Sequence, residues 1–263
     1  SPLLDEPRYS FRTIELGYAL PAGNTAPGWD DLGIVEINIR GLLLYWESMR
    51  GTDLDLSGAW DNMILHNFDG TSSSYTLTMA RISLQWSQRF VQGYGLRASV
   101  SPGVYAALSE LSSDGFALPF SIVGIKDLGP RSSVYAGVDV YPGFDHVVDP
   151  RIGLFVGNGD AFRLNLGYPE TLLSVAPTSD FRLTASASWR AWPEYSMDDD
   201  PRKTLRYTEG RYAGGLHVTL SPITELNMEV GRAFNREISF DSAAPDVDLD
   251  DALFIKLGLS SLF

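Results

Sequence analysis

The chain contains no cysteine among its 263 residues, so disulfides, thiolate metal sites and cysteine nucleophiles are all excluded. It also has no run of about 18 apolar residues, which excludes a membrane-spanning helix. The formal net charge of −13 argues against a nucleic-acid partner, because the phosphates would be repelled. No stretch of useful length has the apolar period of an amphipathic helix. These absences leave an acidic, all-β chain.

Alternation with a period of two runs through most of the sequence. For example, Val35 and Ile37 alternate with Glu36 and Asn38, a pattern that puts aliphatic and charged side chains on opposite faces of a strand. Turn residues such as glycine, proline, asparagine and aspartate separate the alternating stretches. We therefore predict an antiparallel all-β fold of about 12–14 strands, over residues 11–20, 33–46, 53–60, 75–90, 94–107, 118–125, 134–141, 151–156, 161–168, 172–176, 181–195, 206–220, 225–240 and 252–263.

The last of these stretches, residues 252–263, has an apolar face formed by alternate residues and ends on an aromatic. It resembles the C-terminal insertion signal of bacterial outer-membrane β-barrels, with Lys256, Gly258 and the final Phe263 as its matching positions. Ser261 departs from the pattern, since an apolar residue is usual there. The resemblance implies a Gram-negative-type outer-membrane location and insertion by the barrel-assembly machinery. The alternative is an amphipathic edge strand of a soluble sandwich.

Loop lengths favour the barrel. Long and tight connections alternate along the chain, as they do in barrels with long outer loops and short periplasmic turns. We predict a single domain over residues 1–263, closed and up-and-down, with residues 1–9 as a periplasmic segment. We also expect that a signal peptide preceded Ser1 and was removed. The resemblance makes a porin-like channel for small polar solutes the expected function, without an enzymatic activity or a cofactor.

The polar faces of the strands carry charges of both signs, which would line the lumen of a barrel. In one interpretation these charges line a water-filled pore. In the other they pair across the lumen and close it, which leaves a structural barrel that docks an envelope partner through its first residues or its acidic outer loops. The predicted pore-lining residues are Glu15, Glu36, Arg40, Arg81, Arg89, Arg97, Asp139, Arg163, Arg182, Arg190, Glu194, Arg211, Glu225 and Glu229.

Two arginines break the alternation, because Arg232 and Arg236 share the parity of the apolar residues Met228 and Val230. Both lie toward the outer end of their strand. One hypothesis is that they bind lipopolysaccharide phosphate in the headgroup zone, for which the geometry of arginine is suited. The alternative is a local bulge that turns them inward.

Candidate residues for other chemistry are few. The only histidines are His66, His146 and His217, and none has the serine two residues away that barrel hydrolases pair with a strand histidine. The acidic segments 198–200 and 246–251 could offer oxygen ligands to calcium, but they lack the glycine and distal glutamate of an EF-hand loop. We therefore predict no metal site and no catalytic residue.

Overall fold

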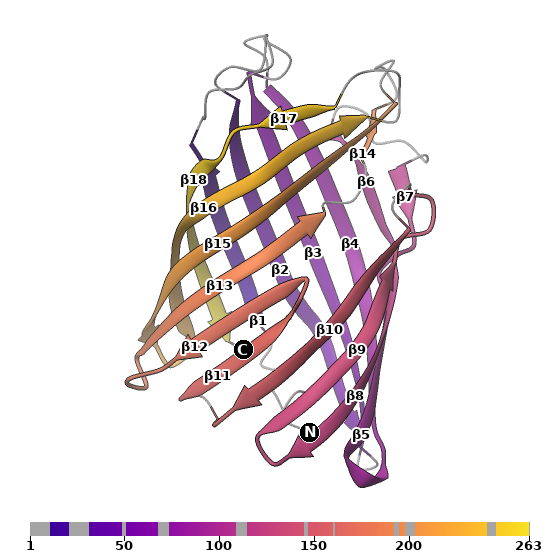
Figure 1. Ribbon diagram of the computed structural model, residues 1–263, viewed down its shortest axis with the longest axis vertical. Coiled ribbons are helices and arrows are strands. Elements are labelled where there is room, and N and C mark those ends of the chain that lie inside the picture. Colours follow the sequence, from indigo (N-terminus) through magenta and orange to yellow (C-terminus); the bar gives the residue numbers. More distant parts are fainter. Residues whose placement is uncertain are drawn as a thin grey trace.

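The computed structural model of the chain is a β-barrel (Figure 1). It describes residues 11–20, 32–48, 51–67, 74–108, 115–144, 147–159, 161–191, 195–197, 203–240 and 246–262. The predicted periplasmic segment, residues 1–9, therefore lies outside the described residues.

Within the described ranges, eighteen strands form one sheet. Four crossings of the wall consist of two consecutive strands each, so the barrel has 14 strands in the usual sense, as predicted from the alternation. The four split crossings are β5 (Tyr94–Val100) with β6 (Gly103–Ala107), β7 (Phe116–Ala117) with β8 (Phe120–Gly129), β13 (Phe181–Ala191) with β14 (Tyr195–Met197), and β17 (Val247–Leu249) with β18 (Ala252–Leu262). The others are β1 (Phe11–Ala19), β2 (Gly33–Ser48), β3 (Thr52–His66), β4 (Ser74–Arg89), β9 (Ser132–Val140), β10 (Val148–Gly157), β11 (Phe162–Tyr168), β12 (Glu170–Val175), β15 (Lys203–Ser221) and β16 (Thr224–Phe240).

The sheet closes on itself through its first and last strands. Leu16 of β1 is paired with Ile37 of β2 on one side and with Leu257 of β18 on the other, both antiparallel. Closure gives both of these strands a neighbour on each side, which a sheet in hydrocarbon requires. The soluble sandwich is therefore wrong, because one continuous wall replaces two stacked sheets.

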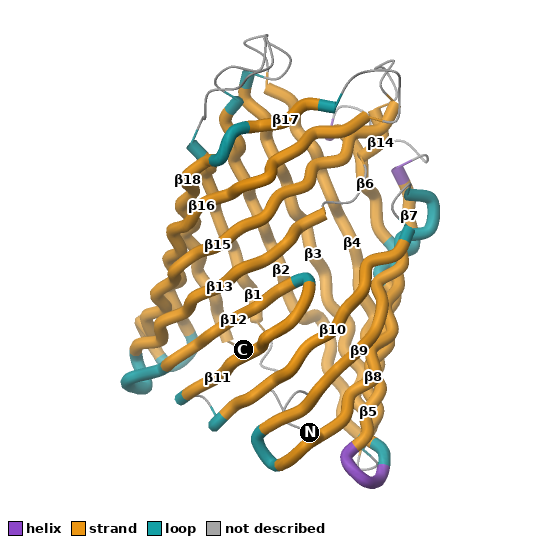
Figure 2. The backbone as a smooth tube through the Cα atoms, in the orientation of Figure 1, coloured by secondary structure: helices purple, strands orange, loops and turns teal. Residues whose placement is uncertain are grey.

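The two ends of the barrel differ in their connections (Figures 1 and 2). At the lower end in Figure 1, tight turns join neighbouring strands, such as the 3-10 turn Val91–Gly93 between β4 and β5. We call this end the short-turn rim. The opposite end, the long-loop rim, carries the longer connections, which include residues 20–32 and 241–246. The predicted alternation of loop lengths is confirmed, with Tyr168–Glu170 as the short exception.

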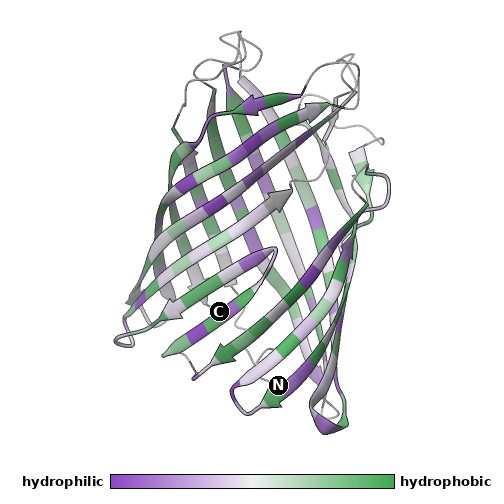
Figure 3. Ribbon diagram, viewed as in Figure 1, coloured by the Kyte–Doolittle hydropathy of each residue, from purple (hydrophilic) through white to green (hydrophobic). Residues whose placement is uncertain are grey.

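The two faces of the wall have opposite character, and Figure 3 shows hydrophilic and hydrophobic residues interspersed along the strands. On β18, Leu253, Ile255 and Leu257 face outward and are 47–59% exposed. Phe254 and Lys256 alternate with them and are buried inside, at 4% and 7% exposure. The apolar face of the last strand therefore lies on the exterior, the surface that hydrocarbon would contact.

An apolar cluster fills the lumen toward the long-loop rim. Its side chains come mainly from β1 to β4, β6, β7 and β14 to β18 and are almost completely buried. We call this cluster the apolar plug. Its largest fully buried members are Leu32, Ile34, Met63, Leu65, Leu77, Tyr105, Tyr195, Leu205, Tyr207 and Ile238.

Candidate functional site in the lumen

A cavity of about 510 Å³ occupies the other half of the lumen, between the apolar plug and the short-turn rim. Strands β5, β8 to β13, β15 and β16 contribute its walls. Small polar side chains on one strand, Thr184, Ser186 and Ser188 of β13, leave space between the larger residues opposite. The charged lining comprises five arginines and two glutamates: Arg97, Arg151, Arg163, Arg182, Arg211, Glu170 and Glu229.

Several of these arginines have acidic partners beside the cavity. Arg151 donates to Asp139 at 2.5 Å, and Arg182 donates to Glu225 at 3.3 Å. Glu225 also contacts the Nδ1 atom of His217 at 3.0 Å. Arg151 and Arg182 remain more than 40% exposed despite these contacts. They can therefore still interact with a solute in the cavity, because partly solvated ion pairs exchange partners at little cost.

One side of the cavity is apolar. Val123 and Ile125 of β8 are buried there with Phe155 of β10, beside the ring of Tyr135. The Tyr135 hydroxyl donates to the Asn165 amide oxygen at 3.0 Å. The cavity thus offers cationic groups together with an apolar patch on β8 to β10.

Two glycines make room for the Tyr135 ring. A Cβ atom at Gly153 or at Gly167 would overlap the Tyr135 hydroxyl. These positions lie directly opposite one another on β10 and β11, so the ring crosses both strands. The absence of side chains at two paired positions therefore fixes where the aromatic side chain lies.

A buried network of charges separates the cavity from the apolar plug. At its centre the Arg211 guanidinium pairs with the carboxylates of Glu36 and Glu209, and all three side chains are at most 6% exposed. Lys256 lies beside Glu36 and Glu15, at 3.9 and 3.8 Å. Because each carboxylate has a cationic neighbour, the network keeps its charges in a region that water hardly reaches.

The network continues into the plug through a hydroxyl group. Tyr207 donates to Glu209 at 2.9 Å and accepts a hydrogen bond from the Arg236 Nε atom at 3.0 Å. Arg236 also donates to the carbonyl of Asp250 at 2.9 Å. The ring of Phe254 packs against the Arg211 guanidinium, 4.8 Å from its carbon atom to the ring centroid. Plug and network therefore form one packed unit.

The structure places most of the predicted pore-lining residues at the lumen. Arg97, Arg163, Arg182, Arg211 and Glu229 line the cavity, and Asp139 and Glu225 pair with cavity arginines. Of the others, Glu15 and Glu36 contact Lys256, and Arg40 lies 3.5 Å from Asp61. Arg81 is hydrogen-bonded to Tyr105, and Arg89 is at the end of β4 nearest the short-turn rim. The Arg190 side chain and Glu194 lie outside the described residues.

Sequence reasoning missed Arg151 and His217 as lumen residues. Arg151 follows a proline in a stretch whose alternation starts only at that point, and it meets Asp139 diagonally across β9 and β10. His217 has the same parity as the predicted inward residues Arg211 and Glu225, and this parity could have identified it as a lumen residue.

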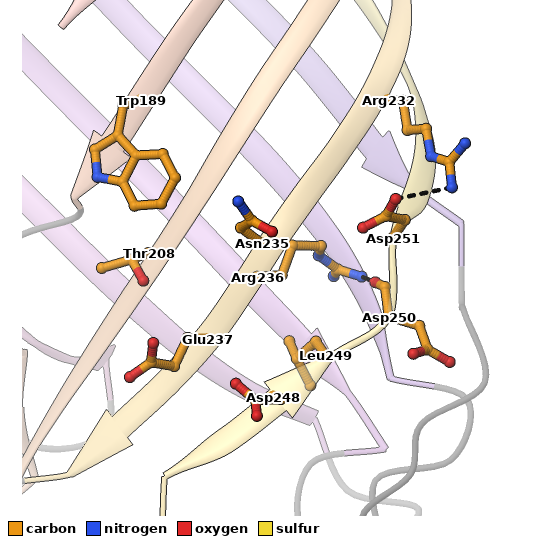
Figure 4. A pocket seen from close by; sticks show the side chains of 10 residues that line it. All are labelled: Trp189, Thr208, Arg232, Asn235, Arg236, Glu237, Asp248, Leu249, Asp250 and Asp251. Atoms are coloured by element: carbon orange, nitrogen blue, oxygen red, sulfur yellow. Dashed lines mark hydrogen bonds and ion pairs between the residues drawn. The ribbon is translucent and has the colours of Figure 1, made fainter.

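The hypothesis that Arg236 binds lipid headgroups is wrong. A bulge at Asn235, whose φ is 47°, shifts the register between β15 and β16 and reverses the parity beyond it. Arg236 consequently points inward and is 3% exposed. Arg232 precedes the bulge and stays on the exterior, where it contacts Asp251 at 2.8 Å (Figure 4).

The residues of the predicted insertion signal have a clear place where they are described. Lys256 faces the lumen, and a Cβ atom at Gly258 would come within 3.0 Å of the Glu15 side chain. Phe263 lies outside the described residues. A role of the three residues in insertion stays a prediction.

Other chemical groups are sparse in the part of the chain that the structure describes. It holds no cluster of three metal-binding side chains, and no helix in it is long and apolar enough to cross a membrane. His66 and Ser74, paired across β3 and β4, form a contact of 2.8 Å at the long-loop rim. A serine beside a histidine could act as a nucleophile when a third group orients the histidine, but this pair is exposed at the rim.

Comparison with known proteins places this geometry in a wider class. No family model and no curated protein matches the sequence. Among solved structures, the COG4313 outer membrane channel from Pseudomonas putida F1 is similar over 98% of this chain and 97% of its own, with a TM-score of 0.55 and 12% identity. Two further structures have lower TM-scores. The NanC porin has a TM-score of 0.47 and 9% identity, over 96% of this chain and 100% of its own. The Pseudomonas putida toluene transporter TodX has a TM-score of 0.46 and 9% identity, over 99% of this chain and 91% of its own.

Only the first of these similarities bears on the fold, and it agrees with the closed barrel described above. The chain therefore has the fold of the bacterial outer-membrane β-barrels.

Proposed function

We propose that the chain spans the outer membrane of a Gram-negative-type bacterium and conducts small polar solutes through its lumen, with a preference for anions. The observation that carries the proposal is the cavity, whose lining has five arginines against two glutamates. Cationic side chains in a lumen bounded by a low-dielectric wall attract anions and repel cations. Three of the five arginines, Arg151, Arg182 and Arg211, also pair with carboxylates beside the cavity, so we expect the preference for anions to be modest.

The apolar plug sets the limit on what the axis of the barrel can pass. Its ten large side chains lie in the path from the cavity to the long-loop rim. Apolar constrictions resist ions because they lose water easily. We therefore expect a low conductance. The plug is also the observation that favours the second candidate function, a non-conducting barrel that docks an envelope partner.

Conductance separates these two functions. Purified protein in planar bilayers should give discrete small steps, and a salt gradient should give a reversal potential of the sign expected for anion selectivity. Replacing Arg97 and Arg163 together by serine should lower the anion preference by about fivefold, the factor for about 1 kcal/mol of charge interaction. Arg232→Ser, on the exterior, is the matched control and should change nothing. A silent membrane would favour the docking barrel.

We further propose that lipopolysaccharide contacts Arg232, the arginine that remains on the exterior near the long-loop rim. Its guanidinium lies with Trp189 and Asp251 along a surface pocket (Figure 4). Arg232→Ser should reduce the lipopolysaccharide retained on purification by about twofold, because a single exposed contact contributes little. Arg40→Ser in the lumen is the control. Equal retention by both variants would reject the contact.

A further inference from the structure

The wall of the barrel is interrupted between β10 and β13. On one edge, β10 is paired with β9 from Val148, but with β11 only from Ile152. On the other, β13 is paired with β15 as far as Ala191, but its last bond to the β11–β12 hairpin runs from the Trp189 amide to the Pro169 carbonyl, at 2.8 Å. Above the hairpin, neither edge has a second strand partner among the described residues. We call this interruption the side gap.

The side gap exists because two neighbouring elements end early. β11 and β12 have seven and six residues, and their hairpin ends well below the long-loop rim (Figure 1). Beyond them, β14 does not continue along β12. It pairs in parallel with β6, Ser196 opposite Ala106. At the long-loop end, β14 is therefore in direct contact with β6.

The cavity reaches the side gap. Tyr168, Pro169 and Glu170, at the tip of the hairpin, line the cavity. So do Arg151 on the β10 edge and Ser188 on the β13 edge. The residues that border the side gap therefore also line the cavity.

The exterior around the gap is apolar. Val148 and Ile152 are exposed on β10, and Trp189 is exposed on β13. In a membrane these side chains would contact hydrocarbon, where unpaired backbone groups are costly. Unpaired strand edges at that depth need water from the cavity or the polar group of a ligand. An amphipathic ligand fits this setting, because its polar head can contact the strand edges while its apolar tail contacts apolar side chains.

We propose that the side gap admits amphipathic carboxylates from the membrane into the cavity. This inference rests on the proposed membrane setting. The carboxylate is bound by Arg151 on the β10 edge of the gap, because a guanidinium group forms paired hydrogen bonds with a carboxylate. The alkyl chain lies against the apolar side of the cavity, along Val123, Ile125 and Phe155. Such a ligand avoids the apolar plug, which constricts the axial path.

Photo-crosslinking in lipid nanodiscs tests the proposal. The probe is decanoate with a terminal diazirine, and the matched control probe is the corresponding alcohol. Decanoate should form adducts on β8 and β10 inside the cavity, and the alcohol should yield about tenfold fewer, since it lacks the charge-assisted hydrogen bonds. Equal yields from both probes, or adducts spread over the exterior, would overturn the proposal.

A blocked gap provides the second arm. Because the chain has no cysteine, Glu170→Cys can be labelled selectively with a bulky maleimide at the tip of the hairpin. The label should reduce cavity adducts by about tenfold, whereas the same label on Ser179→Cys, at the short-turn rim, should not. Unchanged adducts in the blocked protein would refute side access.

Chloride conductance, recorded on the same preparations, separates this proposal from the proposed channel. Adducts without conductance would reject the channel and support the gap. Conductance without adducts would support the channel and reject entry through the side gap.

Discussion

Arg211→Met should lower the free energy of unfolding by about 3–5 kcal/mol, the usual cost of removing one partner from a buried ion pair. The variant leaves Glu36 and Glu209 charged inside the barrel, where both are almost fully buried. Lys256 is 3.9 Å from Glu36 and compensates only one of the two carboxylates closely. The loss should appear as a lower urea midpoint for unfolding in detergent, followed by tryptophan fluorescence.

Two controls distinguish this effect from a general loss of packing. Arg40→Met removes a lumen arginine that is half exposed and 3.5 Å from Asp61, and should cost less than about 1 kcal/mol. Adding Glu36→Gln and Glu209→Gln to Arg211→Met should restore most of the stability, because no uncompensated charge remains. A single variant as stable as the parent protein would show that the network contributes nothing.

Tyr195→Ala should raise the single-channel conductance by at least about twofold, because it removes one of the largest side chains from the apolar constriction. Tyr195 is completely buried on β14, next to the contact between β14 and β6. The cavity left behind should also destabilise the protein by about 3–5 kcal/mol. Conductance in planar bilayers is the primary measurement, with the heat-induced mobility shift in gels as a check that the barrel has folded.

Tyr212→Ala is the matched control for this experiment. Its ring is on the exterior, half exposed, and packs against Phe234. Its removal should leave the conductance unchanged. If Tyr195→Ala folds and conducts no better than the parent, the plug does not limit passage along the axis.

Alternation predicted the strand positions, and with the loop lengths and the C-terminal resemblance it was enough to predict the closed barrel and the asymmetry of its rims. The physical reason is that lipid outside the barrel favours apolar side chains and water inside it favours polar ones. Neighbouring residues of a strand point to opposite faces, so the two kinds alternate. The C-terminal strand illustrates this, since Ile255 and Leu257 are outside while Lys256 between them is inside.

The interior was predicted less completely. Parity indicates on which face of the sheet a side chain lies, but not which residues it contacts across the lumen. Ile34 and Leu65 share the inward face with charged residues, so the plug could not be separated from the cavity without knowing which strand ends lie together. The position of Arg236 depended on one inserted residue at Asn235, and the break in alternation left both a bulge and a lipid contact open at Arg232 and Arg236. The side gap follows from the lengths of paired segments, which a single sequence does not contain.

The central claim is that hydrocarbon contacts one parity of each strand and water the other. Single cysteines along β18 test it most directly, because the chain has none of its own. With a fluorophore attached, Ile255→Cys and Leu257→Cys should be quenched by brominated lipids, whereas Phe254→Cys and Ser260→Cys should not. Equal quenching at both parities, or quenching at the inward positions alone, would contradict the account.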